Sequence, residues 1–553
     1  MSIDVRSVLD PASRGREPPD WSARLCDLPR EQRACSNFAS RRRGRTDESG
    51  GSHPRLATVR HGAPLAWSNV APLSRRDLLC RSFNGLGALA LASLLADEAR
   101  SAPPPDDAAN PLAPKLPHFP PAARRCIFLF MSGGVSQVDT FEHKPALTQY
   151  AGRTMPALPN LKGEIAANLT KNVVPMPEMW PFASFGQSGR KVSSLFENLG
   201  PLVDQLAFVH GIIGDSNNHG PATLQISTGS ELQGSPSVGA WVTYGLGSET
   251  RDLPGYVVIC DPRGEPTNGN AVWSAGFLPA SFQGTPLNSK GPPIVDLTLP
   301  AGVSTPRARR ELDLIRRLNE KHATVRPEHA ELEARIAAYE LAYRMQMAAP
   351  EAIDISQETE HIQRLYGLDR PQTRAFGRQC LLARRLAERG VRFTLLVHGV
   401  TNSQEAGWDH HGAIRPNIKN AIGEIDRPIA GLLSDLAQRG LLEDTLVVFT
   451  SEMGRTPFRQ LGTPADLDKA GRDHNQYGLC SWLAGAGVKP ASDAGATDEF
   501  SVRGVGEEIL MRDFHATILS LLGLDDSALT YLHEGRFKRL TDLGGRVLDE
   551  VLA

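Results

Sequence analysis

Hydrophobic positions in the second half of the chain fall into short continuous runs and into helical repeats, and these predict alternating strands and helices. Residues 391–397 and 445–450 are apolar runs of strand length, which predicts buried strands. Between them, residues 418–438 carry apolar positions at helical spacing, and residues 373–389 do the same before the first run, with Gly390 as a C-terminal stop. Alternation of strand, helix and strand is typical of β-α-β units and a mainly parallel sheet.

The same patterns set the limits of the folded domain, which we expect to span 122–553. Its first strand begins at Arg124 and runs through an apolar segment to Met131. From about residue 306 to 348, apolar residues recur at helical spacing among many charges, which predicts a helical insertion broken near Pro327.

The residues before this domain lack the pattern of a packed core. Residues 1–73 are rich in Arg, Ser, Gly and Pro and are expected to be disordered. In the segment 74–101, Arg75 and Arg76 precede a short, mildly apolar stretch, which is the pattern of a twin-arginine export signal. Residues 102–121 are rich in Pro and Ala and predict a linker. We therefore expect export by the twin-arginine machinery to the periplasm or the cell exterior.

Composition excludes several classes of function. With 60 basic and 62 acidic residues the net charge is -2, which gives no electrostatic case for binding nucleic acid. No apolar stretch reaches the roughly 20 residues that a spanning helix needs, so no stable transmembrane anchor is predicted. The seven cysteines form no C-x-x-C pair, and we expect buried free thiols rather than a thiolate zinc site.

Carboxylates and imidazoles gather just past the predicted strands, where open α/β sheets place their ligand sites. Asp409 and His411 follow the run at 391–397, Glu452 follows the run at 445–450, and His474 comes about twenty residues later. Asp139 is the first carboxylate after the Gly-Gly turn that ends the first strand. Oxygen and imidazole ligands suit zinc, calcium, magnesium or manganese, and the set is large enough for one or two divalent ions.

In order, the chain carries strand-Gly-Gly-Asp, Asn-His-Gly-Pro, Gly-Trp-Asp-x-His, Ser-Glu-x-Gly-Arg-Thr-Pro and Gly-Arg-Asp-His. This series resembles the exported bacterial family called domain of unknown function 1501, which is similar to the alkaline phosphatase and sulfatase superfamily. The resemblance implies an alkaline-phosphatase-like α/β/α sandwich with a mainly parallel central sheet and a helical insertion. It also implies that five residues bind metal: Asp139, Asp409, His411, Glu452 and His474.

The chain departs from that superfamily at the nucleophile. Sulfatases carry a cysteine that becomes formylglycine shortly before a Thr-Gly pair, and phosphatases carry Ser or Thr there. Here Thr228-Gly229 is present without the cysteine, and His219 falls at the nucleophile position. His219 is therefore a candidate ligand, covalent group or general base, with Thr223 or Ser216 as substitutes if the loop differs. Arg455 is a candidate for binding an anionic ester, with a structural ion pair as its alternative.

Together, these expectations predict that the protein is an exported metal-dependent hydrolase that acts on sulfate or phosphate esters of small molecules or polysaccharides. His219 and Arg455 would be its catalytic residues. One alternative is a catalytically degenerate member of the family that serves as an envelope or polysaccharide-binding protein. Another is a mutase or transferase on the same fold.

Overall fold

The computed structural model describes residues 110–154, 173–291, 293–294, 299, 302–325, 330–400 and 407–553. They belong to one of two compact units of the chain, Ala96–Ala553. The predicted disordered extension 1–73 and the predicted export segment 74–101, with Arg75 and Arg76, lie outside the described residues. Among the described helices, none has the length and apolar character required to cross a membrane.

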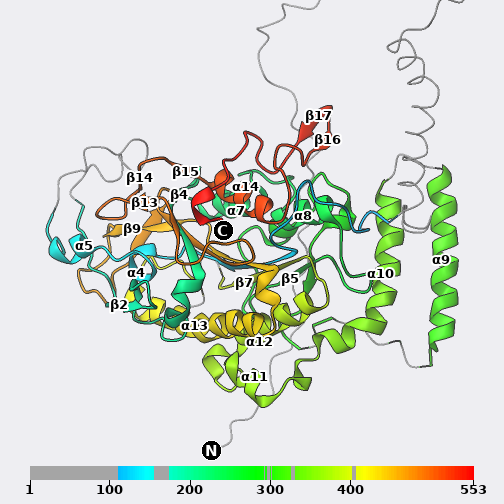
Figure 1. The fold of residues 1–553 in the computed structure, drawn as a ribbon, viewed down its shortest axis with the longest axis horizontal. Coiled ribbons are helices and arrows are strands. Elements are labelled where there is room, and N and C mark those ends of the chain that lie inside the picture. Colours follow the sequence, from blue (N-terminus) through cyan, green and yellow to red (C-terminus); the bar gives the residue numbers. More distant parts are fainter. Residues whose placement is uncertain are drawn as a thin grey trace, which may run out of the picture. The chain divides into compact units, whose positions relative to one another are not determined.

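A nine-stranded sheet forms the centre of the domain (Figure 1). Its path runs in the order β12 (Asp493–Ala494), β4 (Leu206–Ile213), β11 (Leu479–Gly485), β8 (Thr445–Thr450), β1 (Arg125–Met131), β7 (Phe393–His398), β5 (Tyr256–Ile259) and β6 (Thr285–Leu287), and β15 (Ile509–Leu510) also pairs with β4. Every pairing in this sheet is parallel except the two made by β11. The predicted mainly parallel α/β fold is confirmed.

Helices cover both faces of the sheet, and the alternation of side chains along β1 shows why its sequence is continuously apolar. Ile127 and Leu129 pack in the same core as helices α12 (Pro371–Glu388) and α13 (Ile414–Gln438). Phe128 and Phe130 point to the opposite core, which is shared with α7 (His219–Thr228), α8 (Val238–Leu246) and α14 (Met511–Leu521). Figure 1 shows these two helical layers on either side of the sheet. A strand buried on both faces has no polar face to present.

The remaining elements lie around this sandwich. The helical insertion is the pair α9 (Thr305–Val325) and α10 (Ala330–Ile353), and residues 326–329 between them, including Pro327, lie outside the described part. The shorter helices are α4 (Gln137–Thr140), α5 (Pro145–Gln149) and α11 (Glu360–Leu365). Within the described ranges, four two-stranded sheets pair β2 (Phe182–Phe185) with β3 (Arg190–Ser193), β9 (Gly454–Arg459) with β10 (Arg472–Asn475), β13 (Ala496–Thr497) with β14 (Gly504–Val505) and β16 (Tyr531–His533) with β17 (Arg536–Lys538).

The described part of the predicted linker, from residue 110 onward, is attached to the domain. The backbone N–H of Lys115 donates to the carbonyl of Leu246, and that of His118 donates to the carbonyl of Gly523. Leu112 packs against the core to which α8 and α14 contribute. The Pro- and Ala-rich composition did not reveal this, because an extended segment can satisfy its hydrogen bonds on a neighbouring surface without any regular pattern of its own.

His515, on the buried face of α14, makes stability depend on pH. Its Nε2 donates to the carbonyl of Ile226 in α7 at 2.8 Å, and its Nδ1 is buried without a hydrogen-bond partner. Burial lowers the pKa of His515 from 6.5 to about 4. The unfolded chain therefore takes up the proton first on acidification, and stability is lost as the pH falls from 6.5 towards 4, by on the order of 3 kcal/mol.

Replacing His515 with glutamine is expected to remove this part of the pH dependence. Urea unfolding of the variant and of the native protein at pH 7 and pH 4.5 measures the difference. His361→Gln, an exposed position on α11, is the matched control and should leave the native pH dependence unchanged. An identical loss of stability on acidification in His515→Gln would show that His515 does not carry the effect.

Candidate metal centre

The strand order brings four loops to one edge of the sheet. Strands β4, β7 and β8 run in the same direction, so the residues after them lie at one edge; β11 runs in the opposite direction, so the residues before it reach that edge too. Asp409 and His411 follow β7, His219 follows β4 as the first residue of α7, and His474 lies on β10 before β11. Three of these four residues were predicted as ligands from sequence, and the structure brings them together with His219.

Two glycines allow these loops to touch. A Cβ on Gly471 would lie 2.0 Å from the carbonyl of His411, so β10 can approach the Asp409–His411 loop only with glycine there. A Cβ on Gly133, whose φ is +119°, would lie 2.6 Å from the backbone nitrogen of Asp409. The Gly-Gly turn after the first strand therefore supports the Asp409 loop.

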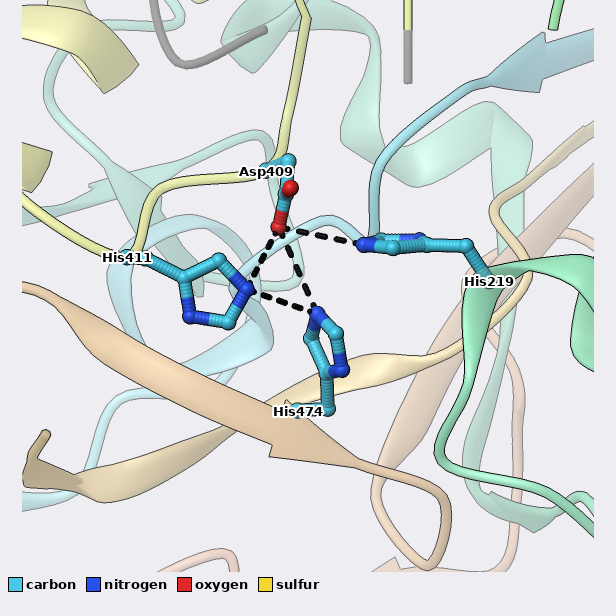
Figure 2. Close-up of side chains that lie close together, drawn as sticks. All are labelled: His219, Asp409, His411 and His474. Carbon is cyan, nitrogen blue, oxygen red and sulfur yellow. Dashed lines mark hydrogen bonds and ion pairs between the residues drawn. The ribbon is translucent and has the colours of Figure 1, made fainter. Parts of the chain in front are cut away.

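Three imidazole nitrogens converge on one carboxylate oxygen (Figure 2). Oδ1 of Asp409 lies 2.9 Å from Nε2 of His411, 3.1 Å from Nε2 of His219 and 3.3 Å from Nε2 of His474. The Nε2 atoms of His411 and His474 are themselves 2.9 Å apart. Asp409 and His219 are buried, whereas His411 and His474 are partly exposed, so the cluster is accessible from the side of these two histidines.

The outer nitrogen of each ring has an oxygen acceptor. Nδ1 of His219 lies 2.7 Å from a carboxylate oxygen of Glu452. Nδ1 of His411 lies 2.6 Å from the amide oxygen of Gln460, and Nδ1 of His474 lies 2.7 Å from the carbonyl oxygen of Asn217. Since these oxygens accept and the rings must donate, a proton sits on each Nδ1, and a neutral ring then directs its Nε2 lone pair into the cluster.

The charges of the cluster are strongly coupled. Burial by itself would raise the pKa of Asp409, but the three imidazoles and Arg455 hold it well below its usual range. Burial opposes a charge on His219, yet the carboxylates of Asp409 and Glu452 raise the pKa of its imidazole to about 9. Burial lowers the pKa of His474. The cluster therefore attracts positive charge, which a proton or a metal cation can supply.

A cation fits this arrangement of donor atoms. Neutral rings with protonated Nδ1 place two lone pairs 2.9 Å apart at His411 and His474, which is repulsive unless a positive charge lies between them. Nε2 of His219 is buried and has no hydrogen-bond partner, although Asp409 is near. Three imidazole nitrogens and one carboxylate oxygen form a typical ligand set for a divalent transition metal.

Glu452 was predicted to bind metal directly, and the structure places it behind His219. It is buried and also accepts two hydrogen bonds from the backbone N–H of Gly133, at 2.8 and 3.1 Å. Its carboxylate therefore orients His219 and keeps the proton on Nδ1, as carboxylates behind metal-binding histidines do.

Replacing Glu452 with glutamine is expected to weaken metal binding by about 10- to 100-fold, because the amide can turn its NH2 towards Nδ1 and favour the wrong tautomer of His219. Competition with a chromophoric chelator measures the affinity. Glu443→Gln, on the loop before β8, is the control for removing one negative charge. A complete loss of binding, equal to that of His411→Ala, would instead indicate that Glu452 is itself a ligand.

Asp139 was also predicted to bind metal, but the structure pairs it with Arg472. Its two carboxylate oxygens accept from Nε and Nη2 of Arg472 at 2.7 and 3.0 Å, and both side chains are fully buried. Ser136 and the backbone N–H of Met179 donate to the same carboxylate. With its oxygens occupied, Asp139 stands outside the group of converging ligand atoms.

Arg455 was predicted to bind an anionic ester, and the structure favours the structural alternative. The side chain is fully buried. Its guanidinium donates to Asp409 at 2.6 Å and to the carbonyl oxygens of Gly133, Gly134, Trp408 and Arg472. Arg455 therefore holds the carboxylate of Asp409 and the Gly-Gly turn in place.

Sequence reasoning missed the residues that orient the candidate ligands. Gln460 and the carbonyl of Asn217 had no distinguishing pattern, because any side-chain amide or peptide group can serve. A chain of hydrogen bonds also supports the loop that carries Asp409. The indole N–H of the buried Trp408 donates to Nδ1 of His398 at 3.1 Å, and Nε2 of His398 lies 2.8 Å from a carboxylate oxygen of Glu424. Thr223 and Ser216, the two candidate substitutes for the nucleophile, do not belong to the histidine cluster. Thr223 is fully buried, and the hydroxyl of Ser216 accepts a hydrogen bond from the backbone N–H of Asn218.

Comparison with known proteins places the chain in a family. No curated protein matches it. Among solved structures, the alkaline phosphatase from the Antarctic bacterium TAB5 is 11% identical, covering 74% of this chain and 99% of its own, with a TM-score of 0.32. The sulfatase PsFucS1 from Pseudoalteromonas sp. is 13% identical, covering 73% and 68%, with a TM-score of 0.31. Similarity at this level assigns no role to any residue. Residues 123–552 match the model of the family described as "Protein of unknown function (DUF1501)", and the chain belongs to this family.

Proposed function

We propose that this protein is a metal-dependent hydrolase of phosphate or sulfate esters, with a single ion held by His219, Asp409, His411 and His474. The observation that carries the proposal is the orientation of the three histidines. Every Nδ1 faces an oxygen acceptor of the protein, and every Nε2 faces the same carboxylate oxygen of Asp409. Such an arrangement leaves the inward atoms as cation ligands.

The donor set favours a transition metal over calcium or magnesium. Three of the four inward atoms are imidazole nitrogens, which suit zinc and iron, whereas calcium and magnesium prefer sites built from oxygen. Asp139 and Glu452, the two carboxylates that would have extended the site to a second ion, are occupied by Arg472 and His219. We therefore propose a mononuclear centre with zinc as its first candidate.

Two features of the site suit an anionic ester. A divalent ion held there would polarise an ester oxygen and lower the pKa of water. His219 is the first residue of the ten-residue helix α7, so an anion at the cluster would face the positive end of the helix dipole. Arg455 was expected to bind the anionic ester but is buried. The divalent ion and the N-terminus of α7 would instead supply the positive charge that binds the ester.

Hydrolysis of aryl phosphates and aryl sulfates by the purified full chain tests the proposal. The protein is depleted of metal, reloaded in turn with zinc, manganese, magnesium or calcium, and assayed at each step. We expect turnover of one ester class that requires metal, is lost in His474→Ala and is retained in His361→Ala, an exposed histidine on α11. Product analysis with an added alcohol separates hydrolysis from transfer to an acceptor. Stoichiometric metal without turnover of either ester would overturn the hydrolase proposal.

A second function is favoured by the number of protein ligands. Four protein ligands complete a tetrahedral zinc site, whereas catalytic zinc sites commonly keep one position open. This observation supports a degenerate member of the family in which the ion stabilises a binding protein of the cell envelope. Stoichiometric metal, no turnover and measurable binding of a sulfated polysaccharide would favour this function.

We also propose export through the twin-arginine pathway, on the pattern of Arg75, Arg76 and the segment 74–101. Replacing both arginines with lysine is expected to retain the protein in the cytoplasm of a bacterial host. Fractionation measures the distribution, and replacing Arg42 and Arg43 with lysine is the control for altering an arginine pair upstream. Unchanged export of the Arg75→Lys, Arg76→Lys variant would contradict the proposal.

A further inference from the structure

A second group of metal-ligating side chains lies apart from the histidine cluster. It consists of Glu142, which follows α4, His210 on β4 and Cys480 on β11. Nδ1 of His210 lies 2.9 Å from a carboxylate oxygen of Glu142 and 3.6 Å from the sulfur of Cys480. The pairing of β4 with β11 shifts register between Leu479 and Ser481, so Cys480 stands at an irregularity of the sheet. Such irregularities redirect side chains that regular pairing would point elsewhere.

The outer atoms of this group are held by other parts of the protein. Nε2 of His210 lies 3.0 Å from Asp493, and that carboxylate is held in turn by Arg190 at 2.6 and 2.7 Å. The second carboxylate oxygen of Glu142 accepts from the hydroxyl groups of Thr497 and Ser501. The inward atoms are therefore one nitrogen, one oxygen and one sulfur, and their orientation is fixed from outside, as at a metal site.

The group of Glu142, His210 and Cys480 is largely buried, yet an ion could reach it from solvent. Glu142 and Cys480 are buried, and a carboxylate inside a protein requires a compensating positive charge, which an ion between the two side chains would supply. His210 and Asp493 are more exposed, with 14% and 43% of their side chains accessible, which provides a route from solvent.

We propose that Glu142, His210 and Cys480 form a second transition-metal site that contains a thiolate, with zinc as the ion of choice. Binding of one divalent ion releases the thiol proton of Cys480 and the Nδ1 proton of His210, and Glu142 contributes its carboxylate. Asp493 keeps the proton on Nε2 of His210 and so directs Nδ1 to the ion. The mixed sulfur, nitrogen and oxygen set excludes calcium and magnesium. This site does not depend on the proposed hydrolase activity.

Cobalt substitution of the full chain tests the site, because cobalt bound to a thiolate absorbs in the near ultraviolet and cobalt bound only to nitrogen and oxygen does not. The native protein should bind about one equivalent of cobalt at each site and show the thiolate band. Cys480→Ser should lose the band and one equivalent. His411→Ala should lose one equivalent and keep the band, so that failure of one site is distinguished from failure of the other.

Cys380→Ser is the matched control, since Cys380 is equally buried and lies on α12. It should behave as the native protein does. If Cys480→Ser does not fold, Glu142→Gln, which keeps the shape of the side chain, should lose the same equivalent of cobalt. A thiolate band that persists in Cys480→Ser, or a native protein that binds cobalt without the band, overturns the proposal.

Discussion

Replacing Asp409 with alanine is expected to remove the metal and to lower the free energy of unfolding by about 3–5 kcal/mol. One oxygen of this carboxylate is the point at which the three histidines meet, and it also accepts from Nη2 of Arg455 at 2.6 Å. Arg455 is fully buried, so the substitution leaves a guanidinium inside the protein without its carboxylate. Breaking a buried pair by removing one partner is costly because the remaining charge keeps its desolvation penalty.

Metal content by elemental mass spectrometry and urea unfolding of the metal-depleted protein measure the two effects separately. His411→Ala should lose the metal without the loss of stability, because it leaves Asp409 paired with Arg455. Asp473→Ala is the matched control, since its carboxylate is 4.0 Å from His411 but is 58% exposed. It should change neither quantity. Native metal affinity in Asp409→Ala would show that the histidines do not need this carboxylate.

Replacing Asp139 with alanine is expected to cost a similar 3–5 kcal/mol of stability while leaving the metal in place. Asp139 and Arg472 are both fully buried, and their two hydrogen bonds join α4 to β10. Removing the carboxylate leaves Arg472 unpaired on the strand that carries His474. The substitution should lower the free energy of unfolding and leave metal binding unchanged, because Asp139 is not part of the histidine cluster.

Unfolding of the metal-depleted protein and metal content of the folded fraction distinguish this role from that of a ligand. Asp468→Ala, a carboxylate that is 67% exposed, is the control and should be close to neutral. Loss of the metal with unchanged stability of the metal-depleted form would restore Asp139 as a ligand. It would also mean that Asp139 leaves its ion pair with Arg472 when the metal binds.

Sequence alone predicted the central strands β1, β7 and β8 and the helices α12 and α13, because strand and helix periodicity is a local property of the chain. The apolar run at β8 was predicted with the bounds that the structure has, and β1 differs by a single residue at its start. Helix α13 begins four residues before its predicted start, at Ile414. The family and the mainly parallel sheet were also predicted from motifs and their order, and both are confirmed.

The residues of the candidate metal centre could be predicted only where the order of strands along the chain carried the information. Asp409, His411 and His474 follow or precede strands of one sheet, and strands that share an edge bring such residues together. His219 was found by its position in the chain, but the groups that its two nitrogens face, Glu452 and Asp409, follow from tertiary packing alone.

The partners of the charged groups were decided by tertiary packing. Asp139 and Arg472 are 333 residues apart in the chain, and Glu452 and His219 are 233 apart. A carboxylate after a strand has the same local sequence whether it meets a metal or a buried arginine. Cys480 had no pattern of its own until an irregular pairing placed it against His210. The sequence therefore determined where polar groups gather, and packing determined which of them meet, because a partner is selected by distance in space and no local periodicity records it.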